Sequence, residues 1–130
     1  FIDWTTQQQF DVVICQGVLH HIPDYVTAID KLKKLVKPKG KIILGLYHPW
    51  GKIAKKFLSI DYNSSILYQD QELNPYEETY TKSEVCKLFS EFIVTNMCPH
   101  ILKNVALASL FNYRSGGLVT YILEKRTAND

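Results

Sequence analysis

The feature that most constrains the fold is an apolar run near the start of the chain that ends in polar residues. Phe10 to Cys15 is rich in β-branched residues with little alternation, which is typical of a strand covered on both faces. Gln16-Gly17 interrupts the run, and a second apolar stretch, Lys41 to Tyr47, follows a helical segment. Parallel strands joined by a helix make a right-handed crossover almost without exception. The chain is therefore predicted to form an α/β sheet.

The segment between these two strands has the periodicity of a helix. Its apolar residues recur at helical spacing from Tyr25 to Val36, and lysines occupy the other face. Asp24 is suited to cap the amino terminus of this helix. Pro38-Lys39-Gly40 is expected to stop it.

The rest of the chain adds elements that alternate between helix and strand. His48-Pro49-Trp50-Gly51 breaks the second strand, and Thr81 with Glu84 resembles a capping box. The expected elements are a helix at 52–58, an irregular stretch at 59–78, a helix from Thr81 through Phe89, a strand from Phe92 to Met97, a helix at 101–113, a turn at Gly116-Gly117 and a strand from Leu118 to Glu124. The final two strands lack the helical crossover pattern that joins the first pair, so we expect one of them to run antiparallel at the edge.

Composition and charge narrow the range of functions. The 130 residues suit one domain, and a net charge of +2 is too small to indicate binding to nucleic acid or to an anionic membrane. No apolar run approaches the roughly 18 residues of a membrane span. Cys15, Cys86 and Cys98 are widely spaced and odd in number. We expect three buried free thiols and a cytoplasmic protein.

Three stretches resemble class I S-adenosylmethionine-dependent methyltransferases, in the branch similar to methyltransferase type 11. Phe10 to Ile22 resembles the family's fourth strand and following loop, with its Phe-Asp-x-Val and Val-Leu-x-His signature. Leu35 to Lys41 is similar to the family's Leu-Lys-Pro-Gly-Gly segment, with Lys39 in place of a glycine. Tyr80-Thr81 with Ser83 to Phe92 looks like the helix before strand six. The resemblance implies a Rossmann-like methyltransferase sheet.

The resemblance also implies that only part of this sheet is present. The family's glycine-rich first loop has no counterpart among the six glycines. Residues 1–130 would then be the carboxyl-terminal part of one methyltransferase domain, holding strands four to seven. In the family the last strand is antiparallel and lies between strands five and six. Such a fragment is expected to be inactive alone.

The resemblance implies S-adenosylmethionine as the cofactor. Four residues at the end of the first strand match the part of the family's site that faces the methionine portion: Cys15, Gln16, Gly17 and Val18. Asp3 is a weaker candidate, because it lies close to Phe10 and the family's acid that contacts the adenine amino group stands further upstream.

Methyl transfer needs alignment of acceptor, methyl group and sulfur, and a base only where the acceptor carries a proton. His20 and His21 are the candidate catalytic residues, and the alternative is that they shape the loop through hydrogen bonds. Being adjacent, they cannot form a facing pair of metal ligands, and no metal site is expected. The substrate-side candidates are Tyr47, His48, Trp50 and Tyr80, for which helix packing and loop anchoring are the alternatives.

Two functions are therefore weighed. The first is methyl transfer to a small-molecule acceptor, without nucleic acid or membrane partners. The second is a non-catalytic half-domain that binds a partner or dimerises, because half a sheet leaves an open edge and an uncovered apolar face. A dinucleotide dehydrogenase is a weaker third option, since the chain has no Gly-x-Gly-x-x-Gly.

Overall fold

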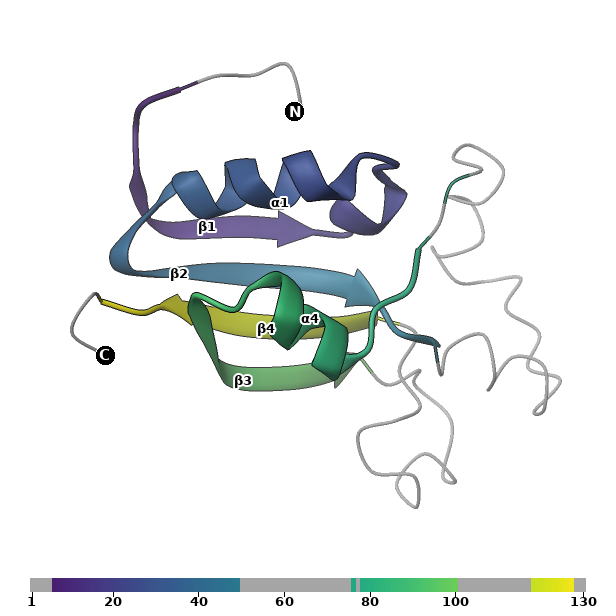
Figure 1. Ribbon diagram of the computed structural model, residues 1–130. Helices are drawn as coiled ribbons and strands as arrows, with labels where there is room; N and C mark the ends of the chain where they lie inside the picture. Colours follow the sequence, from purple (N-terminus) through teal and green to yellow (C-terminus); the bar gives the residue numbers. More distant parts are fainter. Residues whose placement is uncertain (1–5, 50–75, 77, 101–117, 128–130) are drawn as a thin grey trace, which may run out of the picture.

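The computed structural model describes residues 6–49, 76, 78–100 and 118–127. Its elements in chain order are β1 (Phe10–Gln16), a 3₁₀ turn η1 (Leu19–His21), α1 (Tyr25–Lys34), β2 (Val36–Tyr47), α4 (Lys82–Leu88), β3 (Phe92–His100) and β4 (Leu118–Lys125) (Figure 1). The helices predicted at 52–58 and 101–113 and the turn at Gly116-Gly117 lie outside the described residues.

The strands form one sheet in the order β1-β2-β4-β3 (Figure 1). β1 and β2 are parallel, and β4 runs antiparallel to both of its neighbours. The prediction that the antiparallel strand lies at the edge is wrong, because β4 is an inner strand and β3 is the edge. β4 alternates partly exposed residues with Val119, Tyr121 and Leu123, whose buried side chains belong to the apolar core. The observed order is the one that the family resemblance implied.

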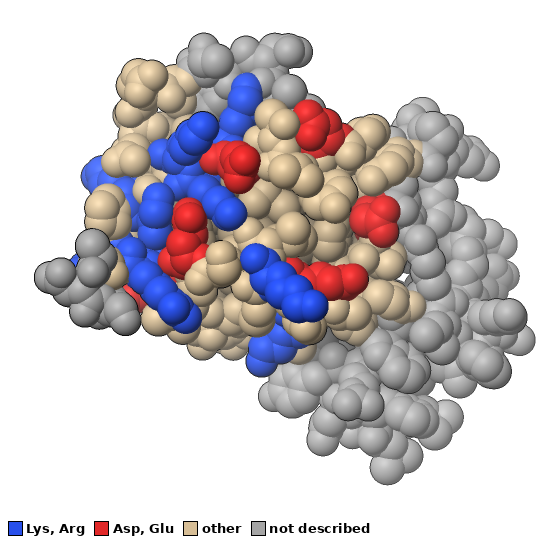
Figure 2. Space-filling model, viewed as in Figure 1, with Lys and Arg blue, Asp and Glu red and all other residues tan. Residues whose placement is uncertain are grey.

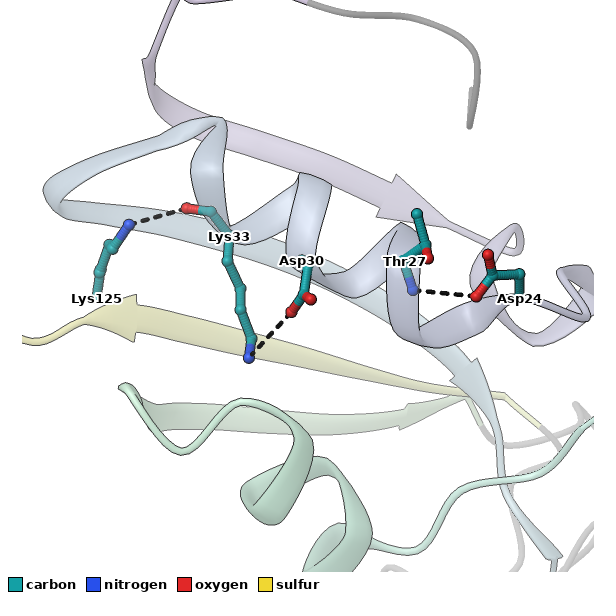
Figure 3. Close-up of polar contacts among 5 residues, drawn as sticks. All are labelled: Asp24, Thr27, Asp30, Lys33 and Lys125. Atoms are coloured by element: carbon teal, nitrogen blue, oxygen red, sulfur yellow. Dashed lines mark hydrogen bonds and ion pairs between the residues drawn. The ribbon is translucent and has the colours of Figure 1, made fainter.

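The β1-α1-β2 crossover is confirmed, with a shorter helix than predicted. The Asp24 side chain caps α1 by accepting a hydrogen bond from the backbone of Thr27 (Figure 3). The helix ends at Lys34, before Pro38-Lys39-Gly40, and Val36 already belongs to β2. The Phe10 amide donates to the Leu35 carbonyl at 2.8 Å, so the start of β1 draws this part of the chain into the sheet.

An irregular stretch separates the first pairing of β1 and β2 from the regular ladder. Phe10 pairs with Val36, but Val12 pairs with Lys41, so β2 carries extra residues between these pairs. Lys39 takes a positive φ of 63° there. A left-handed backbone favours glycine, and glycine is the residue that the family pattern has at this position.

The apolar core lies on one face of the sheet. Residues of α1, α4 and alternate positions of all four strands form a single buried cluster. On the other face, Ile14 is 68% exposed and Val12 is 51% exposed. The prediction that the first strand is covered on both faces is therefore wrong: no described element packs against its second face.

Lys125 of β4 ties the sheet to the carboxyl end of α1. Its ammonium donates to the Lys33 carbonyl at 2.8 Å (Figure 3) and to the Val36 carbonyl at 3.2 Å. A cation at a helix carboxyl terminus also interacts favourably with the helix dipole.

Figure 2 shows further Lys and Arg side chains, with carboxylates among them, gathered toward the end of the sheet where β2 begins and β4 ends.

We expect Lys125→Met to lower the free energy of unfolding by about 1–2 kcal/mol, because two charge-assisted hydrogen bonds are lost while the aliphatic stem is kept. Urea titration followed by circular dichroism measures this change. Lys34→Met is the matched control, since it removes a charge from the same region, and we expect an effect within about 0.5 kcal/mol. Equal losses from both variants would contradict the assignment of the Lys125 contacts.

Candidate functional site

The candidate site lies where the parallel strands β1 and β2 end, the edge at which open α/β sheets bind ligands. β1 ends at Gln16, and the chain turns at Gly17, whose φ is +69°. The Gly17 amide donates to the Gly45 carbonyl of β2 at 3.3 Å. A Cβ added at Gly17 would meet no atom within 4 Å, so this turn borders open space.

The residues around this turn point in different directions. The Cys15 side chain packs in the core, and burial raises the pKa of its thiol, so the thiol stays protonated at neutral pH. The Gln16 side chain instead runs along the sheet, where its amide donates to the hydroxyl of Thr120 at 3.2 Å. Val18 is 45% exposed. Cys86 and Cys98 are free and exposed, so the prediction of buried thiols holds only for Cys15.

Two histidine rings and a tyrosine ring cluster beside the turn. The centroids of His20 and Tyr47 lie 3.8 Å apart, and those of His20 and His21 lie 4.3 Å apart. His20 is fully buried. His21 is hydrogen-bonded through Nδ1 to the Tyr76 carbonyl at 2.9 Å. The structure thus brings both predicted histidines together with Tyr47 at the end of β2.

A short segment before α4 crosses the ends of both strands. The Glu78 amide donates to the His20 carbonyl and the Tyr80 amide to the Tyr47 carbonyl, each at 2.8 Å. Tyr80 is only 4% exposed, and its ring lies 6.0 Å from that of Tyr25. Burial, with smaller contributions from neighbouring tyrosines and glutamates, raises the pKa of the Tyr80 hydroxyl. Tyr80 is therefore a neutral side chain that anchors this segment to the core.

The remaining predicted residues are less closely tied to this cluster. Burial lowers the pKa of His48, against a smaller opposing effect from Glu84, so His48 favours its neutral form. Glu84 completes the predicted capping box with Thr81 at the start of α4. Asp3 and Trp50 lie outside the described residues.

Sequence reasoning missed Gly45 of β2 and Thr120 of β4, which both contact Gln16. A glycine inside a strand often marks the close approach of another group, so the sequence did indicate a neighbouring group against Gly45. Nothing in the local sequence pointed to Thr120, because its contact with Gln16 joins residues 104 positions apart.

An apolar hollow runs along β1 on the side away from β2. Its volume is about 460 Å³, and it lies between β1 and the side chains of η1 and α1. Among the described strands β1 pairs only with β2, so its other edge has free backbone groups. Free backbone groups beside an apolar hollow can accept another strand. No helix in the described part of the chain is long and apolar enough to cross a membrane.

Comparison with known sequences finds a family match over part of the chain. Residues 5–44 match the family described as methyltransferase domain. The chain is 35% identical over 71 residues to a highly reducing polyketide synthase of Leptosphaeria maculans, covering 53% of this chain and 3% of that protein. It is 43% identical over 37 residues to a tRNA U34 carboxymethyltransferase of Nautilia profundicola, covering 28% of this chain and 12% of that protein. The chain thus spans a small part of these relatives.

Comparison with solved structures agrees on the fold. An N-methyltransferase, NodS of Bradyrhizobium japonicum in complex with S-adenosyl-L-homocysteine, matches with a TM-score of 0.61 at 12% identity. The match covers 97% of this chain and 51% of that protein. The described sheet is therefore a part of a Rossmann-like methyltransferase fold.

Proposed function

We propose that this chain, a class I S-adenosylmethionine-dependent methyltransferase by its fold and by its sequence at residues 5–44, forms part of a domain that methylates a small molecule. The observation that carries this proposal is the turn after β1. Gly17 borders open space there, and His20, His21 and Tyr47 lie beside it. Ligand-facing polar groups at the carboxyl ends of parallel strands are the general arrangement of α/β sites.

S-adenosylmethionine is the cofactor of this family, and the residues present fit one part of it. The open space in front of Gly17 leaves the main chain accessible to a ligand. We assign the methionine portion to the turn from Gln16 to Val18, with Cys15 contributing through its main chain. Asp3 is proposed as a weaker contact to the adenine. When bound, the cofactor supplies an activated methyl group on a sulfonium.

The chain's own contribution is to orient and enclose the acceptor. The packed rings of His20, His21 and Tyr47 form a rigid wall beside the turn, and alignment of reactants alone can supply about 7–11 kcal/mol of a barrier. His21 is the better candidate for a proton acceptor, because the Tyr76 carbonyl fixes the proton on Nδ1 and leaves Nε2 as the basic atom, whereas His20 is fully buried. We place Tyr47, His48 and Trp50 on the acceptor side, and Tyr80 supports that side by anchoring the segment that crosses it.

We further propose that residues 1–130 are the carboxyl-terminal part of this domain. The open edge of β1, its apolar hollow and the exposed Val12 and Ile14 are suited to pair with another strand and its helices. The Bradyrhizobium japonicum protein of this fold is about twice as long, since this chain covers 51% of it. The chain alone would then lack activity.

The same surface supports a second candidate function, that of a non-catalytic module that binds a partner or forms a homodimer. Ile93 of β3 is 46% exposed, so an exposed apolar side chain is also present at the other edge of the sheet. A clean monomer in light scattering, with no binding partner, would count against this alternative.

The net charge and the cysteines bear on the binding partners and the cellular compartment that we propose. A net charge of +2 gives no reason to expect nucleic acid or an anionic membrane as a partner. Exposed free thiols at Cys86 and Cys98 fit a reducing compartment, for which we propose the cytoplasm.

Calorimetric titration with S-adenosylhomocysteine tests the proposal. We expect no binding to the 130-residue chain and micromolar binding once an upstream glycine-rich strand and loop complete the domain. At 100 times the dissociation constant, the ligand should add about 2.7 kcal/mol to the free energy of unfolding, which a melting curve checks. A natural upstream sequence without that loop, together with no binding, would contradict the proposal.

A further inference from the structure

Gln16, Gly45 and Thr120 form a row across three neighbouring strands. Gln16 stands opposite Gly45 in the β1-β2 pair, and Gly45 stands opposite Thr120 in the β2-β4 pair. Leu44 and Leu46, on either side of Gly45, are buried in the core beneath the helices. Because side chains alternate along a strand, the row lies on the opposite face of the sheet.

The absence of a side chain at Gly45 lets Gln16 reach β4. A Cβ at position 45 would overlap the side-chain oxygen of Gln16. Neighbouring strands are about 4.8 Å apart, so a side chain can contact the next strand but one only by crossing an empty position. Gln16 Nε2 donates to Thr120 Oγ1 at 3.2 Å, and the hydroxyl also lies 3.5 Å from Gln16 Oε1.

The same glycine holds the main chain of the turn. The Gly45 carbonyl accepts the Gly17 amide at 3.3 Å. The turn is therefore held twice, through its backbone to β2 and through the Gln16 side chain to β4. Loss of the Thr120 contact would remove the hydrogen bond that fixes the Gln16 side chain beside Gly17.

We propose that Gly45 and Thr120 are positioning residues for the turn from Gln16 to Val18. The inference rests on the proposed function, in which this turn borders the methionine portion of the cofactor. Thr120 holds the Gln16 side chain flat on the sheet, and Gly45 leaves the room for it. Together they keep the approach to the Gly17 backbone clear.

The test compares Thr120→Val, Thr120→Ser and Gly45→Ala in the full-length protein, labelled with ¹⁵N at glycine and glutamine. In Thr120→Val we expect the Gln16 side-chain amide and the Gly17 amide signals to move, and the Gly17 amide to exchange with solvent about tenfold faster. Thr120→Ser keeps the hydroxyl and should restore both signals. Gly45→Ala should displace the Gln16 amide in spite of an intact Thr120.

Affinity for S-adenosylhomocysteine is the second readout. We expect it to fall about threefold to tenfold in Thr120→Val, the effect of one neutral hydrogen bond, and to recover in Thr120→Ser. Unmoved signals in Thr120→Val, or a Thr120→Ser that behaves like it, would overturn the inference. So would moved signals with unchanged affinity. A wild-type protein that binds no S-adenosylhomocysteine refutes the proposed function instead, and the amide signals still decide whether Thr120 holds the turn.

Discussion

Replacing Gly40 by alanine is expected to lower the free energy of unfolding by about 3 kcal/mol, the upper part of the range for overpacked positions. An added Cβ would lie 2.8 Å from Val36 Cγ1, 2.9 Å from the Lys37 carbonyl oxygen and 3.0 Å from the Asp11 carbonyl oxygen. Two of these atoms belong to the backbone, so β1 and β2 must separate to admit the methyl group. Urea-induced unfolding of the variant measures the loss.

The neighbouring Lys39→Gly is the matched control, because its effect should have the opposite sign. Lys39 has a φ of 63°, a conformation that costs an L-residue about 1–2 kcal/mol. Glycine removes this cost, but its greater conformational freedom in the unfolded chain offsets part of the effect. We therefore expect the free energy of unfolding to rise by about 1 kcal/mol or less. If both variants destabilise the protein equally, the irregular stretch of β2 does not have the described conformation.

Gly17→Val is expected to weaken S-adenosylhomocysteine binding to the complete domain by about 100-fold. A β-branched residue is strongly disfavoured at the φ of +69° that Gly17 adopts, and its side chain would fill the space through which a ligand reaches the main chain. Strain of about 1–2 kcal/mol and the steric block together account for this loss. Calorimetric titration measures the change.

Gly17→Asn separates these two causes. Asparagine tolerates positive φ, and no atom lies within 4 Å of the added Cβ, so the variant should melt close to the wild-type protein. Its side chain still occupies the open space, and binding should remain weak. Wild-type affinity in Gly17→Asn would show that the cofactor does not approach this backbone, and the proposed role of the turn would be wrong.

The proximity of several candidate residues could be predicted, because their positions follow directly from local sequence. The turn at Gln16-Gly17 comes straight after a strand, and a parallel partner then places Tyr47 at the same edge. The contact of His20 with Tyr47 confirms that neighbourhood. The sequence could not show that His20 is fully buried while His21 bonds the Tyr76 carbonyl, because that depends on the segment crossing above both strands.

The β-α-β unit could be predicted from its hydrophobic pattern alone. The Asp24 cap of α1 and the Thr81–Glu84 capping box could also be predicted, because each joins residues three positions apart in the chain. The exposure of Val12 and Ile14, and the reach of Gln16 to Thr120 over Gly45, could be seen only once distant strands were paired. The inner position of β4 was implied by the family resemblance and not by the residue pattern. These outcomes depend on strands distant in sequence coming together. The periodicity of apolar residues predicts which side chains are suited to burial. Which face of the sheet the helices cover is seen only when the strands are paired.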